Sequence, residues 1–172
     1  MRSDKLQKLT LAGVFAALTA IFTLLIQIPS PTKGYINTGD VLVNLSAWVL
    51  GPAYGAAAAG IGSAMADLIS GYTVYAPATL IIKAGMAVAS YAVYTRFSRK
   101  QKTFRALLAG AVAAETVMIL GYAVFAGVLY GSLSSAFLSV PENLVQGIFG
   151  AAVSSAVYAA LRRRSTRLHT VI

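Results

Sequence analysis

The stretch from Gly34 to Lys83 reads GYINTGDVLVNLSAWVLGPAYGAAAAGIGSAMADLISGYTVYAPATLIIK. Its two apolar runs meet at the breaker pair Gly51-Pro52, and the run before the break, Asp40 to Leu50, has only eleven residues. A helix of that length covers about 17 Å, well short of the roughly 30 Å hydrocarbon core of a membrane. Non-helical backbone must complete that crossing, and a membrane tolerates such backbone where protein buries it or a cavity solvates it. The stretch therefore predicts the wall of a polar pocket.

Composition indicates an integral membrane protein. Hydrophobic residues make up 58% of the 172 residues, charged residues make up 11%, and the mean hydropathy is +0.73. Soluble domains carry about 25% charged residues. The length suits a single membrane domain over residues 1–172 with about six spans. The absence of cysteine excludes disulfides, thiolate metal sites and cysteine nucleophiles, and we expect no metal or cofactor.

The basic residues indicate the orientation of the chain. Twelve of the fourteen lie in three clusters, each flanking an apolar run: residues 2–8, 96–105 and 162–167. The positive-inside rule places such clusters in the cytoplasm, so both termini and the central loop are predicted to lie inside. The net charge of +9 does not indicate nucleic-acid binding, because the basic clusters flank apolar runs and do not form a solvated surface with interleaved aromatic residues.

The fold predicted from these patterns is all-α, with six transmembrane helices and a short second helix. A basic lead-in precedes the first helix, the segment Pro29 to Gly34 is predicted as an outside loop, and Gly131 to Val140 as another. The predicted helices run over Thr10 to Ile28, Asp40 to Leu50, Ala53 to Ile69, Ala78 to Tyr94, Ala106 to Tyr130, and from Pro141 to about Leu161.

Polar side chains within or beside these spans are the candidate substrate-binding residues. Glu115 is the strongest of them, because a carboxylate at least nine residues from either end of a span must be protonated, paired or bound to something. Tyr122 lies two turns further out and can share its face. The full set is predicted to line one pocket open to the outside: Asn37, Asp40, Asp67, Tyr72, Lys83, Glu115, Tyr122, Asn143 and Gln146.

Several of these residues have a simpler explanation. Asn37 and Asp40 can cap the second helix. Lys83 can extend to the outer interface, pair with Asp67, or meet a carbonyl or anionic group of a ligand. Glu142, in the first turn of the last predicted helix, is explained by the helix dipole.

The first predicted helix carries small residues every four positions, at Ala12, Ala16 and Ala20, with Gly13 and Ala17 on the neighbouring stripe. Such spacing lets another helix approach closely inside a membrane. The stripe can pack against this protein's own helices or against a partner protein.

The order of these motifs resembles one family, the substrate-capture (S) components of energy-coupling factor transporters, which import vitamins into prokaryotes. The resemblance covers nearly the whole chain. It rests on the alanine repeat, GYINTGDVLVNLSAWVLGP, GIGSAMADLISGY with APATLIIK, Glu115 with Gly121-Tyr122, and PENLVQ. It implies a six-helix protein of the cell membrane that binds a vitamin near the outer face. It also implies docking through Ala12, Ala16 and Ala20 onto a transmembrane coupling (T) subunit that acts with two cytoplasmic ATPases.

Within that family the pattern most resembles the branch of hydroxymethylpyrimidine, pantothenate and cobalamin carriers, and hydroxymethylpyrimidine is the best prediction. Carboxylates and amides can pair with an aminopyrimidine, and tyrosines can stack on it. Pantothenate, cobalamin, pyridoxine and riboflavin remain alternatives. An intramembrane enzyme with Glu115 and Asp67 as an acid-base pair is disfavoured by the lack of an embedded histidine, cysteine or metal motif, and a structural subunit with merely paired charges remains open.

Overall fold

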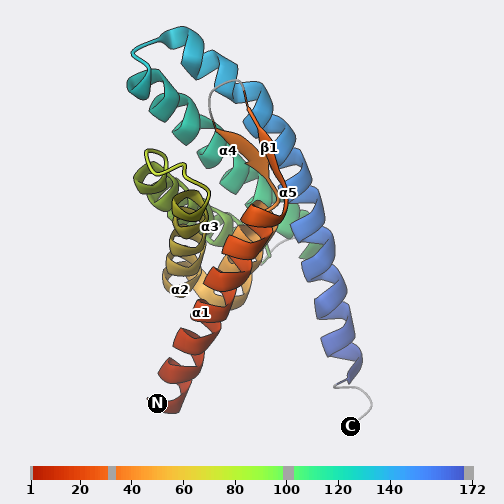
Figure 1. The fold of residues 1–172 in the computed structure, drawn as a ribbon. Helices are drawn as coiled ribbons and strands as arrows, with labels where there is room; N and C mark the ends of the chain where they lie inside the picture. The colour runs from red at the N-terminus through yellow and green to blue at the C-terminus, as the bar shows by residue number, and fades with distance from the viewer. Residues whose placement is uncertain (1, 31–33, 99–102, 169–172) are drawn as a thin grey trace.

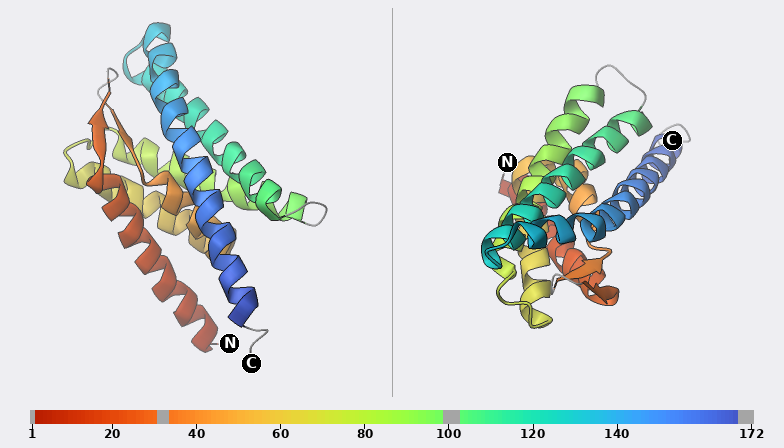
Figure 2. Two further views of the ribbon diagram at one scale, coloured as in Figure 1. Left: turned by 90° about the vertical axis from the view of Figure 1, so that its right-hand side faces the viewer. Right: turned by 90° about the horizontal axis from the view of Figure 1, so that it is seen from above.

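A computed structural model of the chain describes residues 2–30, 34–98 and 103–168. Its elements are α1 (Arg2–Leu25), β1 (Gln27–Pro29), β2 (Tyr35–Asn37), α2 (Asp40–Ile69), α3 (Ala76–Ser98), α4 (Thr103–Leu129) and α5 (Leu133–Leu168). Helices that follow one another in the chain pack together, and α5 also packs on α2. The N-terminal end of α1 and the C-terminal end of α5 lie at the same end of the molecule, away from the β-hairpin (Figures 1 and 2).

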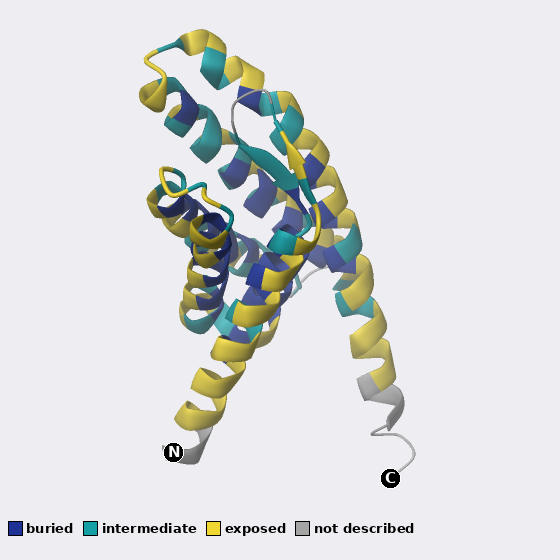
Figure 3. Cartoon of the chain, viewed as in Figure 1, coloured by how far each residue is buried: buried dark blue, intermediate teal, exposed yellow. Residues whose placement is uncertain are grey.

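Five helices in the described ranges are long and apolar enough to cross a membrane. Large apolar residues such as Ile81 and Val128 are exposed. Exposed residues cover the outside of the bundle, and the buried residues lie along its inner faces (Figure 3). A surface this apolar is not expected of a soluble monomer. The prediction of a helical membrane protein is confirmed.

The predicted break in the second helix is present inside α2. Gly51 has φ 81° and ψ −178°, a conformation that L side chains rarely adopt, and Pro52 follows it. Asp40 to Leu50 is therefore a half-length helical segment with its own direction, joined to the next segment without a separate loop.

Other helix boundaries differ from the prediction as well, among them the start of α1, which begins at Arg2 and so includes the basic lead-in. The first helix ends at Leu25, and β1 pairs antiparallel with β2 where only a turn-rich loop was expected. The last helix begins at Leu133 rather than Pro141, so residues 133–140 are helical and not a loop. Pro141 lies inside α5, as proline can in membrane helices whose freed backbone groups find other partners. Glu142 is therefore not in a first turn, and the dipole explanation for it is wrong.

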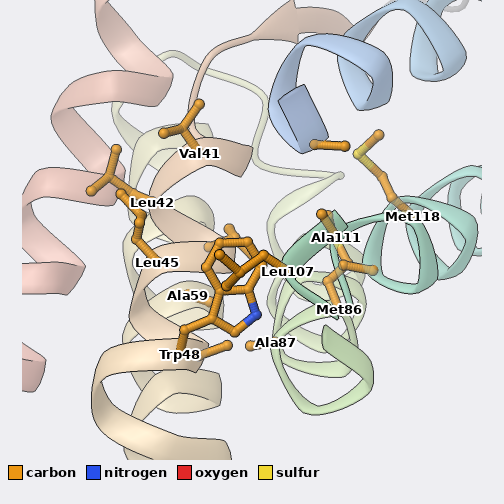
Figure 4. Packing of buried hydrophobic residues seen from close by; sticks show 14 of the residues in the cluster. Val41, Leu42, Leu45, Trp48, Ala59, Met86, Ala87, Leu107, Ala111 and Met118 are labelled. Atoms are coloured by element: carbon orange, nitrogen blue, oxygen red, sulfur yellow. The ribbon is translucent and has the colours of Figure 1, made fainter. Parts of the chain in front are cut away.

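The apolar core lies where α2, α3 and α4 meet. Val41, Leu45 and Trp48 from the half-length segment pack with Met86 from α3 and Leu107 from α4 (Figure 4). This packing anchors the half-length segment in the bundle and holds Asp40, at its start, at a fixed depth.

Candidate functional site

A buried ion pair lies at the start of α2. The Lys83 Nζ donates to Asp40 Oδ1, and the two residues are only 2% and 1% exposed. Gln146 Nε2 donates to the other oxygen of Asp40 at 2.6 Å, and the backbone N–H of Asn37 donates to Gln146 Oε1 at 2.7 Å. Three helices and the hairpin are thus joined through one carboxylate.

This arrangement corrects two of the predictions. Lys83 neither extends to the interface nor pairs with Asp67, because Asp40 is its partner. Asp40 is not a cap either: Gly39 occupies the N-cap position without a side-chain cap. The Asn37 Oδ1 accepts from the Gly39 backbone N–H at 2.9 Å, which fixes the turn into the helix.

Glu115 lies in a second polar cluster at the centre of the bundle. Asn44 Nδ2 donates to Glu115 Oε1 at 3.1 Å, and Ser90 Oγ donates to Asn44 Oδ1 at 2.7 Å. The backbone of α5 approaches closely here, since a Cβ placed on Gly150 would lie 2.9 Å from Glu115 Oε1. Glu115 is therefore enclosed by α2, α3 and α5 behind Asp40.

A pocket lies on the hairpin side of the ion pair and contains about 540 Å³ of empty space, its open mouth included. Residues from all five helices and from the hairpin region line it: Thr23, Gly34, Tyr35, Asn37, Ser63, Asp67, Tyr75, Thr79, Lys83, Tyr122, Ala126, Ser139, Glu142, Asn143 and Gln146.

The hairpin is tied to the C-terminal end of α2 beside this pocket. Tyr35 OH donates to Asp67 Oδ1 at 2.5 Å, and Gln27 Nε2 donates to Ser70 Oγ at 2.8 Å. Burial, together with the charge of Asp67, raises the pKa of the Tyr35 phenol, so the phenol remains a donor. The Tyr72 ring lies 4.6 Å from the Tyr35 ring, centroid to centroid, and supports it from behind.

The structure brings most of the predicted residues to the pocket. Those that line it are Asn37, Asp67, Lys83, Tyr122, Asn143 and Gln146. The other three predicted residues, Asp40, Tyr72 and Glu115, do not line the pocket. Asp40 bonds to the lining residue Lys83, and Tyr72 packs on the lining residue Tyr35. Glu115 bonds to Asn44 further inside the bundle.

Sequence reasoning missed several lining residues, including Tyr35, Ser63, Tyr75 and Thr79. Ser63 and Thr79 look like ordinary small residues of membrane helices. Tyr35 lies in the stretch from Gly34 to Lys83, but only the hairpin brings its hydroxyl to Asp67.

The alanine stripe of α1 faces largely into the protein. Ala12 packs with Leu50 and Ala58 of α2, and Ala20 is buried. Ala16 is partly buried, and its carbonyl approaches Gly62 so closely that a Cβ there would lie 2.4 Å away. Internal packing, one of the two alternatives for this stripe, is thus observed for Ala12 and Ala20, whereas Gly13 and Ala17 are exposed.

These features define a multi-helix membrane protein with an internal polar pocket. Residues 3–163 match the family described as "ECF-type riboflavin transporter, S component". The chain belongs to this family of S components of energy-coupling factor transporters. Its members are transport components, so the chain is not an enzyme.

Two further proteins are similar to this chain. A protein of Pyrococcus woesei, described as "Uncharacterized protein in gap 3'region", is 36% identical over 145 residues, covering 84% of this chain and 94% of its own. A solved structure described as "Structure and mechanism of the S component of a bacterial ECF transporter" has a TM-score of 0.73 at 21% identity, covering 95% of this chain and 98% of that one. The second likeness shows that the fold is shared.

Proposed function

We propose that this chain captures a water-soluble vitamin or vitamin precursor for ATP-driven import by an energy-coupling factor complex in a prokaryotic plasma membrane. The observation that carries the proposal is the pocket: buried polar side chains from every helix converge on it inside an otherwise apolar bundle. Polar groups inside a membrane are energetically costly, and they usually line a cavity or path that takes up a polar solute. Family membership supplies the transport context.

The lining favours a flat ring that donates hydrogen bonds. Tyr35, Tyr75 and Tyr122 offer aromatic faces, and Asp67 and Asn143 offer oxygen acceptors. Lys83 is already paired with Asp40, which disfavours a carboxylate ligand such as pantothenate. Riboflavin, which the family description names, is the first compound to test, and hydroxymethylpyrimidine, favoured by the sequence, is the second.

A thermal-shift screen of the purified protein against water-soluble vitamins and precursors tests this proposal. A ligand at 100 times its dissociation constant is expected to stabilise the folded protein by about 2.7 kcal/mol. Stabilisation by riboflavin or hydroxymethylpyrimidine, without turnover, supports capture. If no vitamin raises the unfolding temperature, a structural subunit with internally paired charges is the better account.

The pocket is proposed to open outward, in a six-span topology in which Asp40 to Leu50 and the rest of α2 count separately. The clustered basic residues support this orientation, with both termini in the cytoplasm. An impermeant amine reagent added to intact cells is expected to label Lys33, and not Lys100 or Lys102. These three lysines lie outside the described residues. Efficient labelling of Lys100 from outside would overturn the topology.

The proposed partners are a transmembrane coupling subunit and two cytoplasmic ATPases, which the chain needs because its sequence contains no phosphate-binding loop. The surface proposed from the sequence for the coupling subunit is the small-residue side of α1. Since Ala12 and Ala20 are buried and Ala16 packs close to Gly62, a partner helix would reach α1 mainly along Gly13 and Ala17.

A further inference from the structure

Two buried polar groups on α2 lack a hydrogen-bond partner although they border the pocket. They are Ser63 Oγ and Asp67 Oδ2, in residues that are 1% and 4% exposed. No residue in the described ranges, 2–30, 34–98 and 103–168, bonds to either atom. Buried polar atoms are nearly always hydrogen-bonded, so an unpaired one calls for an explanation. Residues four apart on a helix share one face, so these two groups lie one turn apart along the same wall.

The position of Asp67 is fixed independently of any ligand. Tyr35 OH holds Oδ1, and Tyr72 packs on Tyr35. The hairpin therefore binds Oδ1, the Thr79 hydroxyl also interacts with the carboxylate, and Oδ2 has no hydrogen-bond partner among the described residues.

The chemistry of the two groups is complementary. An ionised carboxylate oxygen only accepts a hydrogen bond, whereas a serine hydroxyl can donate or accept. The Tyr122 ring lies in the same pocket, with its hydroxyl 2.9 Å from Thr79 Oγ1. A flat heteroaromatic ring near this tyrosine can turn a polar edge toward α2.

We infer that Ser63 and Asp67 form the subsite that reads the polar edge of the ligand, and that this edge carries an N–H donor for Asp67 beside a group that bonds to the Ser63 hydroxyl. The imide edge of a flavin and the amino edge of an aminopyrimidine both have this character. The inference rests on the proposed function. It adds that the N–H donor of the ligand's polar edge decides specificity.

Methylated analogues test the inference directly. Binding is measured for riboflavin and N3-methylriboflavin, and for hydroxymethylpyrimidine and its N,N-dimethylamino analogue. The wild-type protein is expected to bind one parent compound at least about tenfold more tightly than its methylated form. Ser63→Ala and Asp67→Asn should each weaken binding of that parent by about 10- to 100-fold and affect the methylated form much less.

Matched variants control for the loss of a hydroxyl and of a charge. Ser98→Ala removes a hydroxyl that bonds to the Thr95 carbonyl near the far end of α3, and Lys8→Met removes a charge from an exposed position of α1. Both should bind as the wild type does.

The possible failures are distinguishable. If the methylated compounds bind as tightly as their parents, or if Ser63→Ala and Asp67→Asn bind the parent normally, the subsite is wrong while vitamin capture stands. If the wild type binds a different vitamin and neither parent, the subsite is likewise wrong. If no vitamin binds at all, the proposed function is overturned together with this inference.

Discussion

Replacing Lys83 by methionine is expected to lower the free energy of unfolding by about 3–5 kcal/mol, because it leaves the Asp40 carboxylate buried without a cation. Gln146 would remain as a neutral donor to Asp40 and could offset only part of the lost attraction. Thermal unfolding of the purified protein in detergent, without ligand, measures the effect. Lys8→Met, at an exposed position of α1, is the matched control and should have little effect.

The double variant Asp40→Asn/Lys83→Met separates the ion pair from side-chain packing. It removes both charges together, so most of the stability should return. If Lys83→Met unfolds at the wild-type temperature, the pair is not the structural centre that the geometry indicates. If the double variant is as unstable as the single one, packing of the lysine stem is the cause.

Bulky residues on two neighbouring stripes of α1 are expected to impair different properties of the protein. Ala16→Leu/Ala20→Leu should lower stability by about 1–3 kcal/mol and weaken ligand binding, because Ala20 is buried and Ala16 approaches Gly62. Gly13→Leu/Ala17→Leu changes exposed positions, so stability and affinity of the isolated protein should remain unchanged. Uptake in cells should nevertheless fall at least about tenfold, because close approach of the coupling subunit is blocked.

Affinity, unfolding temperature and co-purification with the coupling subunit, measured on the same preparations, distinguish the two stripes. Normal uptake by Gly13→Leu/Ala17→Leu would show that the coupling subunit does not dock on the stripe formed by Gly13 and Ala17. If instead Ala16→Leu/Ala20→Leu folds and binds ligand normally but loses uptake, the partner surface is the stripe first proposed from the sequence.

The sequence alone predicted the features that depend on local pattern. The apolar composition predicted a membrane protein. The pair Gly51-Pro52, which follows the eleven-residue run from Asp40 to Leu50, predicted the break in α2. Carboxylate, amide and lysine side chains inside apolar runs marked the polar interior, because lipid penalises them wherever they lie.

Features that depend on pairing between distant segments were not predictable in the same way. Asp40 and Lys83 are 43 residues apart on different helices, and Asp67 was an equally reasonable partner for the lysine. The strands β1 and β2 have three residues each, too few for an alternating pattern to show. Pro141 is typical of a helix start, and only the packed structure shows that α5 continues through it.

The central claim is that this chain captures a vitamin and delivers it to an energy-coupling factor module. The most direct test is uptake of radiolabelled riboflavin or hydroxymethylpyrimidine into cells that lack their own carriers, with the chain expressed alone, with its coupling subunit and both ATPases, or with ATPases that cannot hydrolyse ATP. We predict accumulation only with the complete, active module. Equal uptake by the chain alone, or no uptake of either compound with the complete module, would contradict the account.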